Sequence, residues 1–276
     1  MIDCHIHLCD DDFDQDRDVV IERAREAGVQ ACLVNTETIE EFAKVLHLAE
    51  KYPGFCLPCF GVHPVQYDIT EGEPPQARSV NATKNLENLD DWFEKHHGQL
   101  IAIGETGLDY TPRYIHTEVD KPNQQLSFKR QIDLAQKYDL PLIPGQFTGS
   151  LKLPTCVQFL RDNQAKNVLL HAFDGNMKAA QGGIEAGFYF SIPPCIVRSN
   201  QKQELAKTVP LSQLLLETDS PVLGPEKDKR NEPMNARISA EWIAKLKNID
   251  VDTVIKTTTE NAHKLFPKLR SMMLVK

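Results

Sequence analysis

Short apolar runs alternate with longer amphipathic stretches from one end of this chain to the other, and this alternation constrains the fold more than any other feature. The apolar runs are rich in β-branched residues, which predicts buried strands. The expected strands are Met1–Ile6, Gln30–Asn35, Phe55–Val62, Leu100–Gly104, Pro141–Pro144, Val168–His171, Gly187–Ile192 and Leu214–Glu217. The stretches between them have the 3.6-residue periodicity of helices. The expected helices are Asp16–Ala27, Thr38–Lys51, Leu86–His96, Asn123–Lys137, Thr155–Asn163, Met177–Glu185, Ser199–Lys207, Asn235–Lys247 and Val251–Leu265.

About eight strand–helix units in 276 residues fit a (β/α)8 barrel, which typically takes about 250 residues. A doubly wound open sheet is the alternative, but its usual strand orders run to about five or six strands. We therefore expect an α/β protein with one domain, residues 1–276, folded as a single (β/α)8 TIM barrel. The segments Gln66–Thr83 and Gly224–Pro233 are expected to be long loops over the C-terminal mouth of the barrel, where active sites form.

Charge and cysteine content bear on partners and on cellular location. The formal net charge of −8 counts mildly against a nucleic-acid substrate and means that any nucleic acid is bound locally, in a pocket. The seven cysteines are odd in number and scattered, and Cys56 and Cys59 lie in one expected strand, which favours buried free thiols. The sequence shows no signal sequence and no apolar run of about 20 residues, so we expect an intracellular protein, cytoplasmic or nuclear, that is not bound to a membrane. We also expect a monomer.

Two histidines at the end of the first expected strand are the strongest chemical signal. Side chains alternate across a strand, so His5 and His7 point the same way. Imidazoles at this spacing are a natural pair of ligands for zinc or a similar divalent ion. Taken alone, the pair is also compatible with chance.

Further potential ligands end other expected strands. Glu105, His171 and Asp219 follow the fourth, sixth and eighth strands. Each of them alone could be a loop carboxylate, a hydrogen-bonded histidine or a helix cap. Because the carboxyl ends of barrel strands share one mouth, their coincidence predicts a metal site at the C-terminal mouth of the barrel.

These residues lie in longer motifs, which occur in a fixed order along the chain. The motifs are Asp3-Cys4-His5-Ile6-His7, Gly61-Val62-His63-Pro64, Gly104-Glu105-Thr106-Gly107-Leu108-Asp109-Tyr110, His171-Ala172-Phe173-Asp174-Gly175 and Glu217-Thr218-Asp219-Ser220-Pro221. Together they resemble the motifs of the TatD-type deoxyribonucleases, members of the amidohydrolase-like barrel superfamily. The resemblance extends from residue 1 to about residue 265.

The resemblance implies up to two divalent ions (Zn, Mn or Mg) per chain and hydrolysis of DNA phosphodiester bonds through a metal-activated water. It implies that His5, His7 and Asp219 hold the first ion, that Glu105 bridges both, and that His171 binds the second. Asp219 and Glu105 are then the catalytic residues, with Asp219 orienting the water and taking its proton. The expected enzyme is an exonuclease acting on single-stranded DNA or 3′ ends.

Weaker candidates lie around these motifs. His63 is expected either to contact a phosphate at the pocket rim or only to cap a turn before Pro64. Arg113 is a candidate phosphate contact, as are Lys227 and Arg230, although such residues are more often solvated surface charges. Asp109 is expected to order the loop after Glu105, and Glu217 to support a ligand histidine.

Gly145 departs from the family pattern, which has a ligand histidine at the end of the fifth strand. With glycine there, the second ion keeps only Glu105 and His171, and Gln146 is a poor substitute. Pro144 is unusual for a central strand, and the stretch Pro144–Leu153 is unlike its neighbours, which an altered reading frame or splice junction would explain.

Two rival functions remain open, and Gly145 is the evidence for the second of them. One is hydrolysis of a small amide, ester or lactone, because this superfamily reuses one metal site for many substrates. The other is a catalytically impaired homologue that keeps the fold.

Overall fold

Eight parallel strands form the centre of the computed structural model, which describes residues 1–70, 72, 74–147 and 156–275. The barrel strands are β1 (Ile2–Ile6), β2 (Ala31–Val34), β3 (Cys56–Phe60), β6 (Ala102–Asp109), β7 (Leu142–Phe147), β8 (Leu169–Leu170), β9 (Tyr189–Ile192) and β10 (Leu214–Leu216). Each of them overlaps one of the expected apolar runs, so the strand assignments are confirmed.

The strands close into a ring in sequence order. Five strands pair in the order β1-β2-β3-β6-β7, and three in the order β10-β9-β8. Bridges from Leu142 to Val168 and from Gly145 to His171 join β7 to β8. The backbone N–H of Asp219 donates to His5 O at 2.9 Å, which ties the segment after β10 to β1. The barrel is therefore confirmed, and the open doubly wound sheet is excluded.

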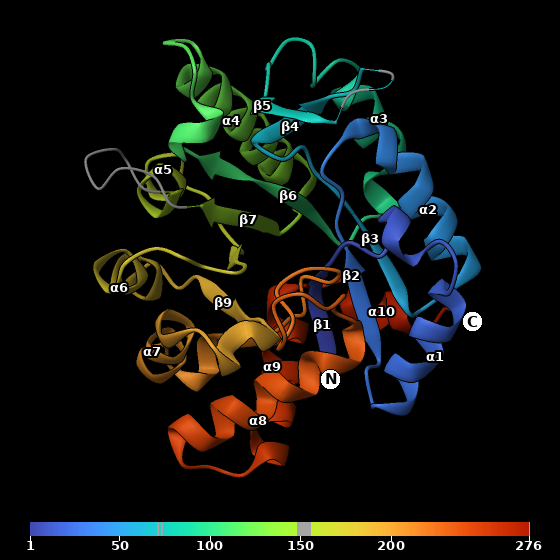
Figure 1. Ribbon diagram of the computed structural model, residues 1–276, viewed down its shortest axis with the longest axis vertical. Coiled ribbons are helices and arrows are strands. Elements are labelled where there is room, and N and C mark those ends of the chain that lie inside the picture. Colours follow the sequence, from blue (N-terminus) through green and yellow to red (C-terminus); the bar gives the residue numbers. More distant parts are fainter. Residues whose placement is uncertain (71, 73, 148–155, 276) are drawn as a thin grey trace.

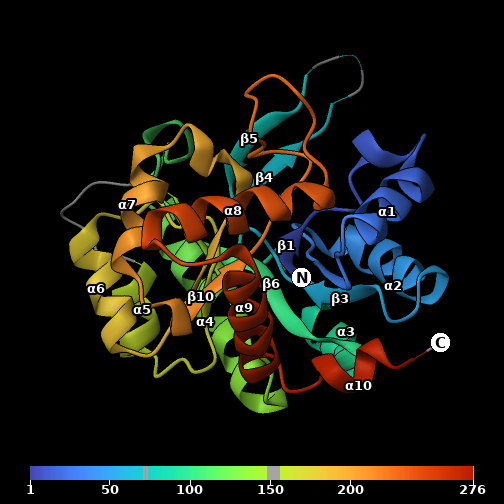
Figure 2. The same cartoon turned by 90° about the horizontal axis from the view of Figure 1, so that it is seen from below.

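Helices cover the outside of the strands (Figures 1 and 2). They are α1 (Arg17–Glu26), α2 (Phe42–Lys51), α3 (Leu89–His96), α4 (Asp120–Tyr138), α5 (Cys156–Asp162), α6 (Met177–Glu185), α7 (Asn200–Thr208), α8 (Ala236–Lys247), α9 (Val251–Leu265) and α10 (Leu269–Met273). Short 3₁₀ turns are η1 (Asp11–Phe13), η2 (Ile39–Glu41), η3 (His97–Gln99), η4 (Pro112–Tyr114), η5 (Pro194–Val197), η6 (Leu211–Gln213) and η7 (Pro233–Asn235). Side chains cap several N-termini, as where Asp250 accepts from the Thr253 N–H. In the described part of the chain, no helix combines the length and the apolar character needed to span a bilayer.

Apolar residues fill both faces of the barrel wall. Val20 and Phe42 from the helices belong to the same buried cluster as Cys32 and Phe60 from the strands. A second cluster takes one or two residues from each of several strands together with α9 and α10; it includes Ile2, Leu33, Leu57, Ile143, Leu169, Leu215, Leu265 and Leu269. Residues from so many strands can meet only inside the ring. All seven cysteines are buried and free, as expected.

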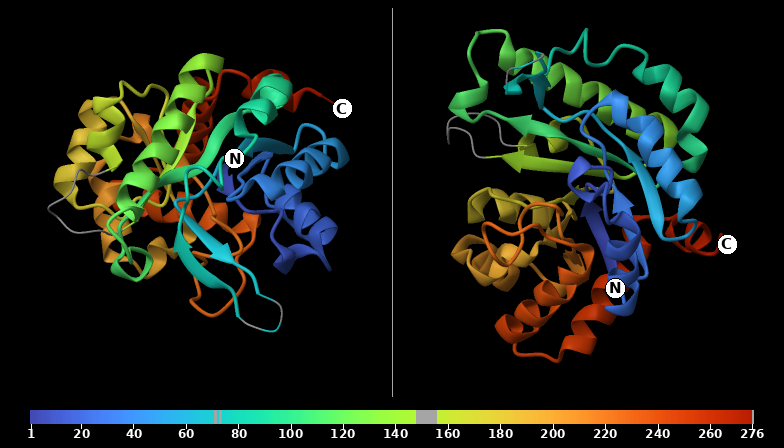
Figure 3. Two further views of the ribbon diagram at one scale, coloured as in Figure 1. Left: turned by 90° about the horizontal axis from the view of Figure 1, so that it is seen from above. Right: turned by 45° about the vertical axis from the view of Figure 1, so that its right-hand side comes forward.

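The segment Gln66–Thr83 is not the structureless loop expected from its prolines. It contains an antiparallel hairpin of β4 (Val65–Asp68) and β5 (Gln76–Ser79), which projects beyond the barrel (Figure 3). Four residues per strand are too few for a clear alternating pattern in the sequence, so the hairpin could not be predicted from periodicity. A backbone hydrogen bond also ties the segment after β5 to the segment before β4. Here Val80 N–H donates to Pro64 O at 2.9 Å. The other expected loop, Gly224–Pro233, has neither helix nor strand before η7.

Pro144 lies inside a barrel strand, contrary to the expectation that proline avoids this position. It pairs with Thr106 of β6, and on the other side the bridges to β8 run through Leu142 and Gly145. The missing N–H of Pro144 therefore falls between bridging residues. The rest of the unusual stretch, from residue 148 onward, lies outside the described residues, so its origin in a splice or frame change stays a hypothesis.

Candidate metal centre

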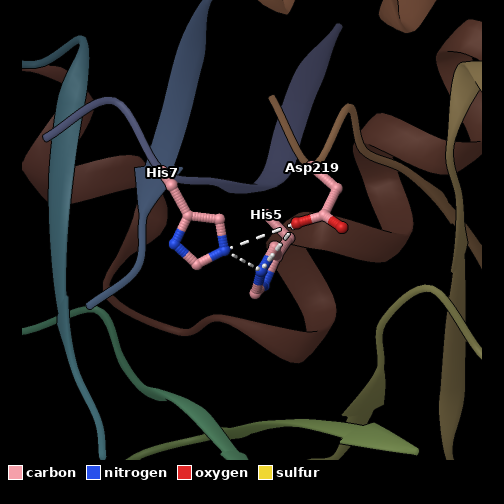
Figure 4. Close-up of side chains that lie close together, drawn as sticks. All are labelled: His5, His7 and Asp219. Carbon is pink, nitrogen blue, oxygen red and sulfur yellow. Dashed lines mark hydrogen bonds and ion pairs between the residues drawn. The ribbon is translucent and has the colours of Figure 1, made fainter. Parts of the chain in front are cut away.

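His5 and His7 come together at the end of β1, as their spacing predicts. Their Nε2 atoms are 3.1 Å apart, and His5 is fully buried. His7 is held by its backbone, because its N–H donates to Ser220 O at 2.9 Å. Both rings point toward Asp219 (Figure 4).

Asp219 joins the two histidines from the segment that follows β10, the last strand of the barrel. Its Oδ1 lies 3.3 Å from His5 Nε2 and 3.4 Å from His7 Nε2. Its φ of 55° is left-handed, a conformation that aspartate tolerates better than most residues. The hydrogen bond from Asp219 N–H to His5 O fixes this backbone directly against β1.

Glu105 joins the two histidines of β1 to His171. Its Oε2 lies 3.3 Å from His7 Nε2 and 3.5 Å from His5 Nε2. Its Oε1 lies 2.7 Å from His171 Nε2. The structure thus brings together all five ligands predicted from the sequence. Glu105 differs from the expectation in one respect, because β6 continues to Asp109 and Glu105 lies inside this strand, where the register with β7 shifts between Ile103 and Thr106.

Gly61 allows Glu105 to reach this position. A Cβ on Gly61 would lie 2.4 Å from Glu105 O and 2.4 Å from Gly104 C, closer than any real contact. The bare backbone of Gly61 lets the Gly104–Glu105 segment pass over β3. Beyond it, Glu105 N–H donates to Thr36 O at 2.8 Å.

Glu217 supports His171 from behind. Its Oε1 accepts from Ala172 N–H at 2.8 Å, its Oε2 accepts from the Ser191 hydroxyl at 2.6 Å, and Oε2 lies 3.9 Å from His171 Nδ1. This matches the supporting role expected for Glu217. Asp109 likewise accepts from Thr111 N–H at 2.8 Å, so it orders the loop after β6.

The carboxylates and imidazoles shift one another's ionisation. Burial opposes the charge of Asp219, but hydrogen bonds from His5 and His7 hold its pKa well below the usual range. Burial also opposes the charge of Glu105, while His171 and His63 hold the pKa of that carboxyl low. Burial lowers the pKa of His5, yet hydrogen bonds to Asp219 and Glu105 outweigh it and raise this pKa to about 9. The ionised carboxylates of Asp219 and Glu105 thus face the protonated imidazoles of His5 and His7, whose protons a divalent cation can replace.

The donor set fits a divalent metal ion. Ligand atoms within 4.8 Å of one another form three overlapping groups among the described residues: His5, His7 and Asp219; His5, Glu105 and His171; His7, Glu37 and Glu105. Imidazole nitrogen and carboxylate oxygen together suit Zn or Mn, and carboxylates suit Mg.

A pocket opens above these groups. Its lining residues are His7, Cys9, Asp10, Asn35, Glu37, Glu41, His63, Tyr67, Glu105, Arg113, Asp219, Pro221 and Val222. Arg113 and His63 therefore lie where a substrate would enter. The turn expected at His63 is present, because Val65 N–H donates to its Nδ1 at 3.1 Å. Its Nε2 lies 3.6 Å from Glu105 Oε1, and its contact with a phosphate stays a prediction. Arg230 instead pairs with Asp16 and Glu232.

Asp10, Glu37 and Glu41 are pocket acids that the sequence analysis missed. Glu37 follows the second expected strand, so the rule that identified the other ligands applies to it as well. Glu37 lies directly before the expected helix Thr38–Lys51, and in the structure Thr38 and Glu41 form a capping box there.

Gly145 lies in β7 opposite Gly107, and the two backbones are close. A Cβ on Gly107 would lie 2.4 Å from Gly145 O. Gly145 is also bridged to His171, so the position that lacks a ligand side chain lies beside a predicted ligand. The side chain of Gln146, the weak substitute considered above, is outside the described residues.

Comparison with known proteins identifies the family. The family model of TatD-related DNases matches residues 2–267. The chain belongs to the TatD-related DNase family. The human protein named deoxyribonuclease TATDN3 is 48% identical to this TatD chain over 273 residues, which cover 99% of this chain and 97% of that protein. An Erwinia tasmaniensis relative named 3′-5′ ssDNA/RNA exonuclease TatD is 30% identical over 283 residues, covering 96% of this chain and 99% of that one.

A solved structure agrees with the fold of this TatD chain. The crystal structure of the Escherichia coli TatD homologue YJJV has a TM-score of 0.79 and 26% identity, covering 97% of this chain and 98% of that one. The resemblance seen in the motifs is thereby confirmed, and this chain is a homologue of metal-dependent hydrolases.

Proposed function

We propose that this chain is a metal-dependent exonuclease that hydrolyses single-stranded DNA from its 3′ end. The observation that carries the proposal is the convergence of His5, His7 and Asp219 with Glu105 at the base of one pocket. A phosphodiester reaches the base of a pocket most readily at a free strand end. The names of the human and Erwinia relatives, a deoxyribonuclease and an exonuclease, support this substrate.

The residues of the chain divide the work. His5, His7 and Asp219 would hold one divalent ion and Glu105 would help to hold a second; bound there, the ions would supply the Lewis acidity that acidifies water and neutralises phosphate oxygens. Asp219, whose pKa is held low by hydrogen bonds from the two histidines despite burial, is the ionised acceptor that orients the attacking water and takes its proton. Arg113 binds a phosphate at the rim, and His63 offers a second contact beside Glu105.

Gly145 keeps one alternative open, a catalytically impaired homologue. The strand-five side chain that would add to the Glu105 and His171 ligands is absent, so the second ion is the vulnerable part of the site. Hydrolysis of a small ester, amide or lactone is the other alternative, and the acidic lining of the pocket favours it.

The test combines metal content with cleavage of a 3′-labelled single-stranded oligonucleotide. Asp219→Asn and Glu105→Gln should each abolish cleavage, whereas Asp228→Asn, in the exposed loop before η7, should not. Bound metal without cleavage in Mg, Mn or Zn would favour the impaired homologue, and turnover of a small ester alone would favour the second alternative.

We further propose that residues 1–276 act as one domain and as a monomer in a reducing, intracellular compartment, cytoplasmic or nuclear. The family match over residues 2–267 supports the first part, and seven free buried cysteines support the last.

A further inference from the structure

The backbone of Glu37 is held from both sides, although the sequence analysis did not single it out. Its N–H donates to Glu41 Oε2 at 2.6 Å. Its carbonyl accepts from His63 N–H and from the Gln66 side-chain amide, both at 2.9 Å. These hydrogen bonds fix the backbone of Glu37, whose side chain lines the pocket.

Thr36 brings Glu37 next to Glu105. Glu105 N–H donates to Thr36 O at 2.8 Å, and Thr36 N–H donates to Gly104 O at 3.2 Å. As a result, ligand atoms of Glu37, Glu105 and His7 lie within 4.8 Å of one another. Because all three residues line the pocket, this group is open to water and to substrate.

The group beside Gly145 has the opposite character. His171 lies flat on His5, with ring centroids 3.7 Å apart and an angle of 6° between the planes. Its Nε2 also contacts Glu105 Oε1 at 2.7 Å. Glu105 is shared with the pocket-side group, but His5 and His171 are at most 2% exposed and are not among the residues that line the pocket, and Gly145 adds no ligand atom. An ion there would sit away from the pocket, with few places for water or phosphate.

The charge of the pocket requires cations on its open side. The lining contains five carboxylates, those of Asp10, Glu37, Glu41, Glu105 and Asp219, which outnumber its basic groups, the guanidinium of Arg113 and the imidazoles of His7 and His63. A phosphate would be repelled unless cations bind between it and these acids.

A buried amide adds a further polar atom beside this group. Asn35 lines the same pocket and is 1% exposed, and its Oδ1 accepts no hydrogen bond from the described residues. This oxygen lies against Gly104, the residue before Glu105. An unpaired buried acceptor costs free energy, which a nearby cation or its water would offset.

We propose that the second cation binds on the pocket side of the centre, between the carboxylates of Glu37 and Glu105, and not beside Gly145. One imidazole nitrogen binds one ion, so His7 Nε2 stays with the ion that His5 and Asp219 share. Two carboxylates completed by water and a substrate phosphate are a typical environment for Mg²⁺ and suit Mn²⁺. The inference rests on the metal-dependent hydrolysis proposed above.

The test counts bound Mn²⁺ per chain by equilibrium dialysis and elemental analysis, without substrate. Glu37→Gln keeps the size of the side chain and removes its charge. We expect it to weaken the second Mn²⁺ by at least about tenfold, while the first ion is retained. Glu40→Gln, a change of the same kind at an exposed neighbour, should bind as the unmodified chain does.

His171→Gln separates the two placements. Retention of the second Mn²⁺ in this variant, with loss in Glu37→Gln, supports the pocket-side ion. Loss in His171→Gln, or no loss in Glu37→Gln, overturns it, as does a single Mn²⁺ in the unmodified chain. Because the readout is metal content, two bound ions without DNA cleavage would refute the proposed function and leave this inference standing.

Discussion

Asp3 accepts two hydrogen bonds from Thr218, one from the backbone N–H at 2.9 Å and one from the hydroxyl at 2.5 Å. Asp3 is fully buried in β1, two residues before His5, and Thr218 precedes Asp219. This pair therefore joins the first barrel strand to the segment after the last one, next to His5 and Asp219, the candidate metal ligands of these two segments.

Replacing Asp3 should lower the free energy of unfolding. Asp3→Asn puts an amide nitrogen where one oxygen now accepts a hydrogen bond, which should lower the free energy of unfolding by about 1–3 kcal/mol. Urea unfolding of the metal-free chain measures this, and Asp228→Asn serves as the exposed control. Unchanged stability would show that the Thr218 contact is dispensable.

Adding a methyl group at Gly61 should displace Glu105. The Cβ of Gly61→Ala would lie 2.4 Å from Glu105 O, so the backbone that carries this ligand must move. We expect a loss of about 1–3 kcal/mol in stability and at least about tenfold weaker metal binding. Gly98→Ala is the matched control, because nothing lies within 4 Å of a Cβ there. Metal affinity equal to that of the Gly98 variant would contradict the steric argument.

Lys202 should stabilise the loop that follows His171. Its buried ammonium donates to Ala172 O at 2.7 Å and to Phe173 O at 2.9 Å. Lys202→Met removes this donor from Ala172 O, while Phe173 O still accepts from the Gln201 amide at 3.0 Å, and should cost about 1–3 kcal/mol. Lys207→Met, on the same helix but 47% exposed, should cost much less. Equal unfolding temperatures for the two variants would refute this role.

Arg113 should contribute to DNA binding more than to catalysis. Its removal in Arg113→Ala should raise KM for a single-stranded oligonucleotide with little change in kcat, because the residue lines the rim. The salt dependence of binding should fall by about the one phosphate contact that is lost. Lys227→Ala, exposed and outside the pocket lining, is the control. A drop in kcat alone would place Arg113 nearer the reacting atoms.

The metal-free chain should lose stability as the pH rises from about 6.5 to about 9. Burial lowers the pKa of His5, but its hydrogen bonds to Asp219 and Glu105 raise it from 6.5 to about 9. Stability from a raised folded-state pKa is fully present below the unfolded value and is lost as the pH passes the folded value. A shift of this size corresponds to about 3 kcal/mol.

Thermal unfolding in EDTA, followed between about pH 6 and pH 10, measures this loss. Added Mn²⁺ should reduce the decline, because the cation then neutralises the carboxylates. A metal-free unfolding temperature that rises over this range would show the opposite sign.

The candidate ligand residues could be identified from the sequence because barrel geometry brings strand ends together. His5, Glu105, His171 and Asp219 each follow an apolar run, and parallel strands place such positions at one mouth. Glu37 also follows an expected strand, so its position at the mouth could have been predicted in the same way. It lies directly before a helix N-terminus with a capping box, and the sequence analysis assigned this segment only as a helix.

The sequence by itself determined the order of strands and helices, the closed barrel and the mouth at which the ligands meet, because periodicity and strand ends are local properties. Only the tertiary structure decided that residues 65–79 pair as a hairpin, that Pro144 is tolerated in β7 and that Thr36 bonds to Glu105. These features depend on contacts between segments far apart in the chain, and no local pattern encodes them. The placement of Glu37 beside Glu105 is of this second kind, which is why the pocket-side cation could be inferred only from the folded chain.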